Sequence, residues 1–462
     1  MSGIQHVRDP LHNIIEFGTS EFEQVMWRVV QTSTFQRLRR VKQLGLSEFV
    51  YPGATHSRFA HSLGVFHTAR RLMKIVEQTN DYNEAKARHA LAAALVHDIG
   101  HGPFSHAFEE VGRRLDLSIA DHEETSVQLI RNGEIGEVLN NFDRGFANGV
   151  ASIIEADSDS IYSAVVSSQF DADRIDYMQR DRLMTGAHHG AIDFEWLMAN
   201  LEVASVPYGS DDEKIDDVQT FVLGSKAVYA AETYVLGLFQ LYPTVYLHKT
   251  TRGAEKVLAE LLLRVIDLGK DKAWKRTGLP HKHPLLAFAR NQNSLNHVIL
   301  LDDFVISGAL DFLTTADDEV VKDLALRLRD RRLYKCIDVR ERLRIHFGLN
   351  ANTEIEKACE SVKVKISDWF DQKQKDCTAP RIIMDEGERN PYKRLYESSG
   401  HVNQIMVKTS SGELVDLVTR SEVVAAIKLF KLYRVYVNDR DDEARTFIEQ
   451  TIDAEVRNGS KT

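Results

Sequence analysis

The stretch ALAAALVHDIGHGPFSHAFE, residues Ala90–Glu109, places ionisable side chains at the end of a segment that is apolar enough to be buried. Alanine, leucine and valine fill its first seven positions, and His97 and Asp98 follow at once. Two more histidines and a glutamate come soon after. Burying an unpaired charge is costly, whereas a bound cation makes several such groups tolerable in one place. The stretch therefore predicts a metal site at the end of a buried helix.

The ligand types narrow the choice of metal. Imidazole nitrogen and carboxylate oxygen suit zinc, iron, manganese or nickel, and the chain has no CxxC pair to indicate a thiolate zinc site. His97 and Asp98 would face different directions on a continuous helix, so the two glycines of HDIGHG are expected to form a turn that brings both to one point. Further ligands must come from elsewhere, and His61 in THSRFAHSLGV and Asp173 in SQFDADRIDYMQRD are candidates.

Composition and charge exclude several classes of protein. The chain has 462 residues, 43% hydrophobic and 27% charged, as in ordinary globular proteins, and its length allows two or three domains. A net charge of -10 provides no global basic field, so nucleic-acid binding is not indicated. Cys336, Cys359 and Cys377 are too scattered for a disulfide framework. No apolar signal segment or membrane-length apolar run is present, so we expect a cytoplasmic protein without membrane contacts.

Hydrophobic periodicity predicts a mainly α fold. Apolar residues recur at three- and four-residue steps in residues 21–44, with a break near residues 32–34. The same pattern fills residues 64–78, 87–98 and 253–269. We therefore expect a helical core.

Strand patterns are sparse and come late in the chain. Residues 404–419 alternate in two runs around SSGE, which predicts an antiparallel hairpin, and residues 432–439 could add a strand to it. We expect a first domain over residues 1–320 and a C-terminal α+β lobe over residues 321–462 that contains this small sheet.

Three motifs carry a resemblance to a known family. HSRFAHSLGV, HDIGHGPFSH and FDADRIDYMQRD resemble the motifs of the HD-domain phosphohydrolases. DPLHNIIEF, TFQRLRRVKQLG, RRLYKCIDV and YRVYV are similar, in order and spacing, to the deoxynucleoside triphosphate triphosphohydrolases related to the vertebrate sterile-alpha-motif and HD-domain enzyme. The main motifs lie within residues 56–181, and the likeness extends over most of the chain. The resemblance implies that the first domain is an HD-domain helical core.

The resemblance also implies the metal ligands and the groups that transfer protons. The metal would be a divalent ion (Mn, Fe, Mg, Zn or Ni) that polarises an α-phosphate oxygen and helps to position a water molecule. Its ligands would be His61, His97, Asp98 and Asp173. The proton-transfer groups would be His106, with His101 and His122 nearby, and Glu109, one helical turn after His106, would orient that imidazole.

Fixed cations are needed to hold a triphosphate. Arg58 and Arg174 are the candidates, because the guanidinium fork suits phosphate oxygens. Asp173, Tyr177 and Asp181 recur at i, i+4 and i+8, so they share one face of a helix. Taken alone, this stripe would better fit a salt-bridged surface face, but beside the histidine motifs it favours a binding site.

The resemblance assigns further residues to the sugar. Tyr177, Asp181 and Gln43 would lie near the 3′-hydroxyl. Leu44 and a later tyrosine, for which Tyr246 is the candidate, would press on the 2′-carbon. Such a site rejects a ribonucleotide by sterics and by leaving a buried polar group unpaired.

Regulation is a further implication of the resemblance. The vertebrate enzyme has an allosteric guanine site whose key carboxylate aligns with Gln31, and an amide cannot accept both guanine N–H groups as a carboxylate does. Gln36 and Arg39 match their counterparts, so activation by another nucleotide stays open. The family also implies a homo-oligomer, either a dimer or a tetramer.

The leading prediction is an enzyme that hydrolyses deoxynucleoside triphosphates to deoxynucleosides and inorganic triphosphate. One alternative keeps the site but changes the substrate to another nucleotide phosphoester. A second alternative is a regulator that binds nucleotides or nucleic acid.

Overall fold

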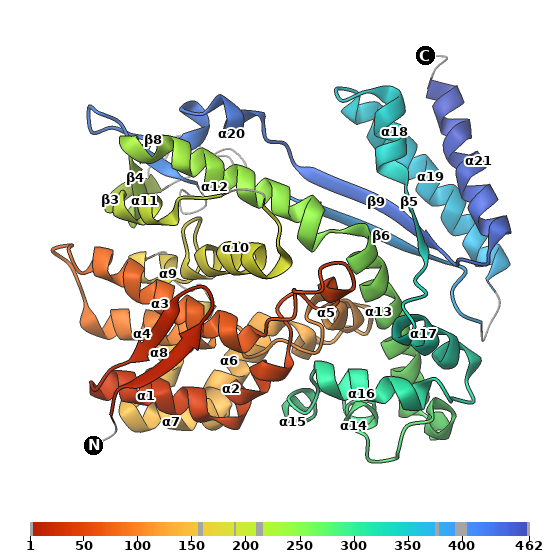
Figure 1. Cartoon of the computed structure of the whole chain (residues 1–462), viewed down its shortest axis with the longest axis horizontal. Coiled ribbons are helices and arrows are strands. Elements are labelled where there is room, and N and C mark those ends of the chain that lie inside the picture. The colour runs from red at the N-terminus through yellow and green to blue at the C-terminus, as the bar shows by residue number, and fades with distance from the viewer. Residues whose placement is uncertain are drawn as a thin grey trace. The chain divides into compact units, whose positions relative to one another are not determined.

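The computed structural model describes residues 3–155, 160–188, 191–208, 216–374, 378–392 and 404–459 (Figure 1). Cys377 lies outside these residues. The chain forms two compact units. The first comprises Met1–Tyr246, Asn293–Phe304 and Pro391–Lys428, and the second comprises Leu247–Gln292, Val305–Asn390 and Leu429–Thr462.

The first unit is mainly helical and carries two small sheets. Its strands are β1 (Gln5–Asp9), β2 (Asn13–Phe17), β3 (Leu201–Tyr208), β4 (Asp216–Gly224), β7 (Met406–Lys408) and β8 (Leu414–Asp416). Its α-helices are α1 (Glu21–Gln31), α2 (Ser33–Arg37), α3 (Arg58–Val76), α4 (Glu84–Val96), α5 (His106–Arg114), α6 (His122–Asn132), α7 (Glu134–Phe142), α8 (Phe146–Ile154), α9 (Ile161–Ala164), α10 (Ala172–Thr185), α11 (Phe194–Ala199), α12 (Val228–Leu241), α15 (Leu295–Val298) and α20 (Glu422–Ala426). Short helical turns are η1 (Leu38–Arg40), η2 (Ser47–Phe49), η3 (Ser118–Ala120), η4 (Ser225–Ala227), the π-turn η5 (Tyr242–Tyr246) and η9 (Leu417–Thr419).

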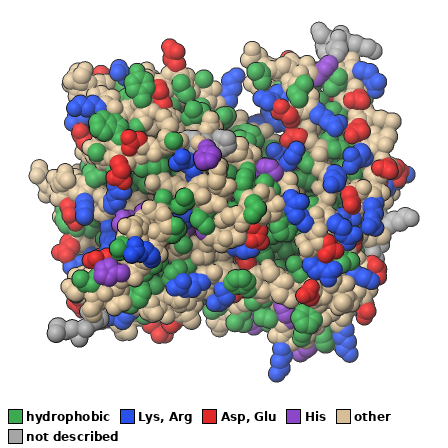
Figure 2. Space-filling model, viewed as in Figure 1, with side chains coloured by type: hydrophobic (Ala, Val, Ile, Leu, Met, Phe, Trp, Pro, Cys, Tyr) green, Lys and Arg blue, Asp and Glu red, His purple; other side chains and the backbone are tan. Residues whose placement is uncertain are grey.

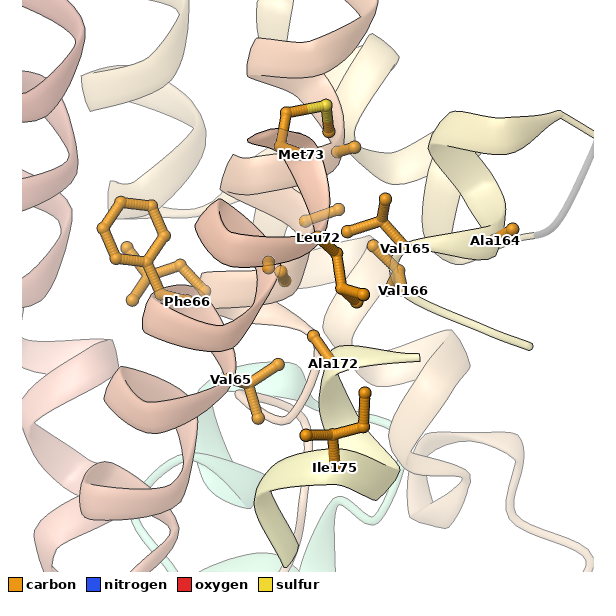
Figure 3. Packing of buried hydrophobic residues seen from close by; sticks show 14 of the residues in the cluster. Val65, Phe66, Leu72, Met73, Ala164, Val165, Val166, Ala172 and Ile175 are labelled. Atoms are coloured by element: carbon orange, nitrogen blue, oxygen red, sulfur yellow. The ribbon is translucent and has the colours of Figure 1, made fainter. Parts of the chain in front are cut away.

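One continuous apolar core fills the first unit. Phe66 and Leu72 of α3 are fully buried in it, as are Val165 after α9 and Ala172 of α10. Figure 3 shows Leu72 facing Val165 and Ala172 between α3, α9 and α10, while Phe66 lies on the other side of α3. Because burial of apolar area stabilises the fold by roughly 25 cal/mol per Å², this core holds α3 and α10 side by side, as Figure 1 also shows.

The predicted helices are confirmed, with small differences at their ends. Residues 21–44 form α1, α2 and η1, and the predicted break falls at Thr32, whose hydroxyl accepts a hydrogen bond from the backbone N–H of Phe35 and so caps α2. The helices predicted at residues 64–78 and 87–98 are α3 and α4. The fold class, mainly α with a small antiparallel sheet late in the chain, is also confirmed.

The strands differ from the prediction in where they pair. The hairpin predicted over residues 404–419 exists as β7 and β8, but β7 pairs in parallel with β4, so the sheet order is β3-β4-β7-β8. The prediction that residues 432–439 could join this hairpin is wrong, because their strand belongs to a separate sheet. Two hairpins, β1–β2 and β3–β4, were not predicted.

The second unit has its own core and its own sheet. Its strands are β5 (Lys335–Asp338), β6 (Ile382–Arg389) and β9 (Phe430–Val437), in the antiparallel order β5-β9-β6. Its helices are α13 (Lys249–Lys270), α14 (Pro284–Arg290), α16 (Asp303–Leu313, whose first two residues belong to the first unit), α17 (Glu319–Arg329), α18 (Val339–Phe347), α19 (Asn352–Lys373) and α21 (Asp442–Gly459), with the turn η6 (Lys272–Thr277). α13 contains the helix predicted at residues 253–269.

The units do not follow the predicted boundary near residue 320. Residues 247–292 pack with the second unit, and residues 391–428, which carry the predicted hairpin, pack with the first. The chain therefore passes between the units several times, and no composition change marks these crossings.

The surface agrees with the balanced composition. On the face that Figure 2 presents, basic and acidic side chains are interspersed. Within the described ranges, no helix combines the length and the apolar character that a membrane span needs.

Candidate metal centre and active site

Three helices of the first unit bring the four predicted ligands together. His61 lies in the first turn of α3, and His97 is the residue that ends α4, with Asp98 next in the turn. Asp173 lies in the first turn of α10, whose N-cap is Asp171. Each ligand therefore stands at a helix end, where the side chain can turn toward a common point.

The donor atoms of the four residues face one another. His61 Nε2 lies 2.9 Å from Asp173 Oδ1 and 3.8 Å from Asp98 Oδ2. His97 Nε2 lies 3.3 Å from Asp98 Oδ1 and 3.6 Å from Asp173 Oδ1. The side chain of His61 is fully buried, whereas that of Asp173 is 35% exposed. The cluster is therefore accessible on the Asp173 side.

The donor set fits a divalent metal. His97 Nε2 is buried and makes no hydrogen bond, and a buried polar atom without a partner is costly unless something else binds it. The other ring nitrogen, His97 Nδ1, lies 3.0 Å from the carbonyl oxygen of Ala94, and His61 Nδ1 lies 2.8 Å from Asp176 Oδ2. Each Nδ1 has an acceptor outside the cluster, which leaves each Nε2 directed into it, as metal-binding histidines require.

The electrostatics also favour a cation in the cluster. Burial by itself would lower the pKa of His61, but hydrogen bonds to Asp173 and Asp176 raise it to about 10. Burial would raise the pKa of Asp173, whereas its hydrogen bond to His61 and the charge of the neighbouring His97 hold this pKa well below the usual range. The carboxylates thus favour positive charge at this point, which a protonated His61 supplies and which a bound metal ion would supply in its place.

A tight turn connects α4 to α5 and carries the rest of the motif. A side-chain carbon on Gly100 would lie 2.2 Å from the carbonyl oxygen of His122, and one on Gly102 would lie 2.2 Å from the ring of Phe108. Neither glycine has a positive φ, so close packing, rather than the predicted backbone freedom, requires them. Phe104 and Ser105 do have positive φ angles, 54° and 45°, which are unfavourable for residues with side chains.

Polar contacts hold this strained turn in place. The backbone N–H of Phe104 donates to Asp303 Oδ1 at 2.7 Å, and Arg58 Nε donates to Ser105 Oγ at 2.9 Å. Arg37 donates to the carbonyl oxygens of His101 and Leu301, at 2.7 Å and 3.0 Å. The turn is therefore determined by its surroundings, as strained backbone at functional sites generally is.

The predicted proton-transfer residues form a second cluster beside the metal ligands. Glu109 accepts from His122 Nδ1 at 2.9 Å and from His106 Nδ1 at 3.1 Å. The rings of His101 and His122 stack 3.9 Å apart, and His101 Nε2 lies 3.3 Å from Asp98 Oδ1. His106 is the exposed member, with 60% of its side chain accessible.

The histidines of this cluster differ in protonation. Burial lowers the pKa of His101 well below its usual value, and the charge of Arg58 adds to the effect. Burial would also lower the pKa of His122, but its hydrogen bond to Glu109 raises it. A neutral imidazole therefore lies against one that gains a proton readily, an arrangement suited to general acid–base chemistry.

The predicted sugar residues also lie together. Tyr246 donates to Asp181 Oδ2 at 2.9 Å, and the rings of Tyr177 and Tyr246 are perpendicular, with centroids 6.0 Å apart. His56 Nε2 lies 2.8 Å from Asp181 Oδ1, and Gln43, whose N–H donates to the carbonyl of His56, keeps a buried side-chain oxygen without a partner. Leu44 is partly buried against the apolar core.

The predicted cations are already paired. Arg58 Nη1 lies 2.5 Å from Asp98 Oδ2, and only 6% of its side chain is exposed. Arg174 lies 3.3 Å from Asp171 and donates to Gln169 at 3.2 Å, with 31% of its side chain exposed. Arg174 is thus the more accessible of the two to an anion.

The predicted allosteric residues lie next to each other. Arg39 Nε donates to Gln36 Oε1 at 2.7 Å, and Gln36 Nε2 donates to the carbonyl of Val30 at 2.7 Å. The Arg39 guanidinium also lies 3.6 Å from the centroid of the Phe59 ring.

Several residues around the site were not predicted. Asp176 and Arg180 follow Asp173 on α10, and their i, i+4 spacing could have indicated an ion pair. His12 stands in the DPLHNIIEF motif but was given no role there, and Asp303 lies far from every motif in the sequence.

Comparisons with known proteins agree with this geometry. Residues 58–181, the segment that carries the four clustered ligands, match the HD domain. An uncharacterized Bacillus subtilis protein, YwfO, is 29% identical over 426 residues, which is 91% of this chain and 88% of that protein. A crystal structure of a phosphohydrolase from Bacteroides thetaiotaomicron superposes with a TM-score of 0.72 at 26% identity, covering 94% of this chain and 99% of the other. The chain therefore contains an HD domain over residues 58–181, and over most of its length it is similar to a phosphohydrolase of known structure.

Relatives with a named activity match a smaller part of the chain. The deoxynucleoside triphosphate triphosphohydrolase SAMHD1 homolog of Dictyostelium discoideum is 31% identical over 259 residues, and mouse SAMHD1 is 27% identical over 301 residues. These matches cover 54% and 55% of this chain, and 48% and 43% of the relatives. The chain therefore matches about half the length of these enzymes.

Proposed function

We propose that this protein is a metal-dependent triphosphohydrolase that converts deoxynucleoside triphosphates to deoxynucleosides and inorganic triphosphate. The observation that carries the proposal is the cluster of His61, His97, Asp98 and Asp173 directly beside the Glu109-centred histidines. The likeness to SAMHD1 and its homolog supports the choice of substrate.

The four clustered residues would hold the metal, which would supply Lewis-acid polarisation of a phosphate oxygen. Its identity among Mn, Fe, Mg, Zn and Ni follows from neither the ligand types nor their spacing. Arg58 would act mainly on the metal ligand Asp98, with which it pairs. Arg174, at the rim, would exchange its contact with Asp171 for a phosphate oxygen.

The Glu109 cluster would handle the protons. Glu109, which accepts hydrogen bonds from His106 and His122, would stabilise either imidazole when it carries a proton. His106 is exposed and hydrogen-bonded to the same carboxylate, which places it to protonate a leaving oxygen.

Sugar selectivity would come from Asp181 and Tyr246. The hydrogen bond between them fixes the tyrosine ring, and the unpaired side-chain oxygen of Gln43 offers a partner to a sugar hydroxyl. Leu44 and Tyr246 would then leave no room for a 2′-hydroxyl.

We further propose that the enzyme forms a homo-oligomer and that a nucleotide could activate it near Gln36 and Arg39. Activation would require a ligand to break the hydrogen bond that these two residues share.

Product analysis tests the proposal. Purified protein would be given each of the four dNTPs alone and in mixture, with Mn²⁺ or Mg²⁺, and ATP would serve as the ribonucleotide control. Deoxynucleoside and inorganic triphosphate in equal amounts, with ATP intact, are expected, and activity that appears only in mixtures would indicate an activating nucleotide.

The variant His97→Ala is the matched control. The Nε2 atom of His97 makes no hydrogen bond, so its removal leaves no protein group without a partner. It should fold and lose turnover. Release of a different phosphate product would move the assignment to another nucleotide phosphoester. Full retention of function in His97→Ala would favour a regulator that binds without catalysis.

A further inference from the structure

The N-terminal hairpin β1–β2 contacts the metal-ligand cluster through one buried carboxylate. Asp176 Oδ2 lies 2.8 Å from His61 Nδ1, and Asp176 Oδ1 lies 2.6 Å from Nε2 of His12, in the turn of the hairpin. The side chains of His61 and Asp176 are fully buried, and that of His12 is 7% exposed. Two segments separated by 164 positions therefore meet at one carboxylate.

A buried arginine ties the same two segments together. Arg180 Nε donates to Asp176 Oδ2 at 2.8 Å, and its Nη2 donates to Asp176 Oδ1 at 3.0 Å. Its Nη1 donates to Asp9 Oδ2 at 2.8 Å, at the end of β1. Asp176 thus accepts from three residues, and each oxygen is held by two donors. Such a fully satisfied buried network has one geometry, and losing a donor is expensive.

Asp9 also builds the turn that presents His12. Its Oδ1 accepts the backbone N–H groups of Leu11 and His12, both at 2.9 Å, and Asn13 adopts a left-handed backbone with φ of 61°. The turn is therefore fixed by the residue that also binds Arg180, so the position of the His12 ring follows from the same network.

The consequence for His61 concerns its tautomer and its orientation. A carboxylate accepts only, so Asp176 requires a proton on His61 Nδ1 and leaves Nε2 directed at Asp98 and Asp173. If Asp176 could rotate, both the tautomer and the ring orientation of His61 would be released. Partners of this kind around a metal ligand typically change metal affinity about 10–100-fold when they are removed.

We propose that the N-terminal hairpin is part of the metal centre, and that His12 is a positioning residue which acts through Asp176 on His61. The inference rests on the proposed metal site, and it extends that site to a segment outside the HD-domain match at residues 58–181. Asp9 contributes by holding the turn and Arg180 together.

Titration of the full-length protein with Mn²⁺, by calorimetry, tests the proposal. His12→Ala removes the donor to Asp176 and should weaken Mn²⁺ binding about 10–100-fold. His12→Gln places an amide N–H near the position of Nε2 and should bind within a few-fold of wild type. The matched control is His6→Ala on β1, whose imidazole pairs with Glu16 and is 54% exposed, and its affinity should equal that of wild type.

The outcomes separate the two proposals. Wild-type protein that does not bind Mn²⁺ would contradict the metal site itself. Wild-type binding together with equal affinities for His12→Ala, His12→Gln and His6→Ala would overturn the role of His12. If His12→Ala does not fold, His12→Asn takes its place, because its shorter amide cannot reach Asp176. The inference then requires weak binding by His12→Asn and near-normal binding by His12→Gln, and equal affinities would refute it.

Discussion

At the scale of single residues, Gly64 on α3 shows how closely the helices must approach behind the proposed metal ligands. A side-chain carbon at Gly64 would lie 2.0 Å from Asp176 Oδ1 and 2.3 Å from Arg180 Nη2. Both groups are buried and ion-paired, so neither can move without losing its partner.

We expect Gly64→Ala to destabilise the protein by about 2–3 kcal/mol and to weaken metal binding, since Asp176 would be displaced from His61. Chemical denaturation and Mn²⁺ titration measure the two effects. Gly308→Ala on α16 is the control, because a side-chain carbon there meets nothing within 4 Å. Its stability should stay unchanged or rise, as alanine favours a helix by about 1 kcal/mol. Equal stability of the two variants would mean that α3 and α10 are farther apart than described.

His67 gives a prediction about pH. Burial, together with the charges of His12, Arg70 and Arg71, lowers the pKa of His67 to about 4, and Asp176 opposes them. A histidine in the unfolded chain titrates near pH 6.5. Between these values the unfolded chain binds a proton that the native state excludes, so the contribution of His67 to stability is complete above about pH 6.5 and is lost as the pH falls toward 4.

The variant His67→Phe should therefore lose less stability than wild type between pH 7 and pH 4.5. Phenylalanine can replace the imidazole without breaking a hydrogen bond at Nδ1, because this atom has no partner in the native structure. The melting temperature across this range measures the effect, with the exposed His6→Phe as the control that should parallel wild type. Parallel curves for His67→Phe and wild type would show that His67 accepts its proton in the native state.

Site residues that stand in an unusual local sequence could be predicted. Site residues that join the site only through contacts with distant segments could not. The run HDIGHGPFSH predicted His97 and Asp98, because few packing needs explain such a sequence. Asp176 looks in sequence like any acidic residue on a polar helix, and only its contacts with His61 and His12 in the fold make it part of the site.

At the scale of elements, the turn between α4 and α5 depends on residues that arrive from elsewhere. Asp303, at the start of α16, accepts the N–H groups of Phe104 at 2.7 Å and Lys42 at 2.9 Å. One carboxylate thus fixes both the strained turn before His106 and the segment that carries Gln43. Burial raises the pKa of Asp303 to about 6, although the two N–H groups act to lower it.

We expect Asp303→Ala to cost about 2–4 kcal/mol, because it leaves two buried N–H groups without an acceptor. It should also reduce turnover more than substrate binding, because the displaced turn carries His101 and His106. Denaturation and steady-state kinetics measure these effects. Asp311→Ala on the same helix removes a carboxylate that is 86% exposed and should leave both unchanged. A fully active Asp303→Ala would show that the turn keeps its shape without this anchor.

Helices could be predicted better than strands for a physical reason. A helix such as α3 satisfies its backbone within itself, so its periodicity is local. A strand needs a partner that the pattern does not name, and residues 430–437 accordingly pair with β5 and β6 instead of with the nearer hairpin. The short runs of alternating buried and exposed residues in β1 and β2 were not predicted for the same reason.

At the scale of the whole molecule, the two units interleave along the chain. The segment 391–428 returns to the first unit after more than a hundred residues spent mostly in the second. Boundaries of this kind are set by long-range packing, so a single cut near residue 320 could not describe them, although the presence of a second, α+β part could be predicted.

All residues of the candidate metal centre belong to the first unit, so we expect metal binding to stabilise that unit. A ligand that binds only the native state stabilises it by about 2.7 kcal/mol when present at 100 times its dissociation constant. Addition of Mn²⁺ should therefore raise the melting temperature, and a chelator should reverse the rise.

Amide hydrogen exchange should slow at the start of α3, in the turn between α4 and α5, and at the start of α10, because the ligands stand at these helix ends. Exchange in the sheet β5-β9-β6 should not change, and His97→Ala should abolish the whole response. Slowing confined to the second unit, or a response that survives in His97→Ala, would place the metal elsewhere in the molecule.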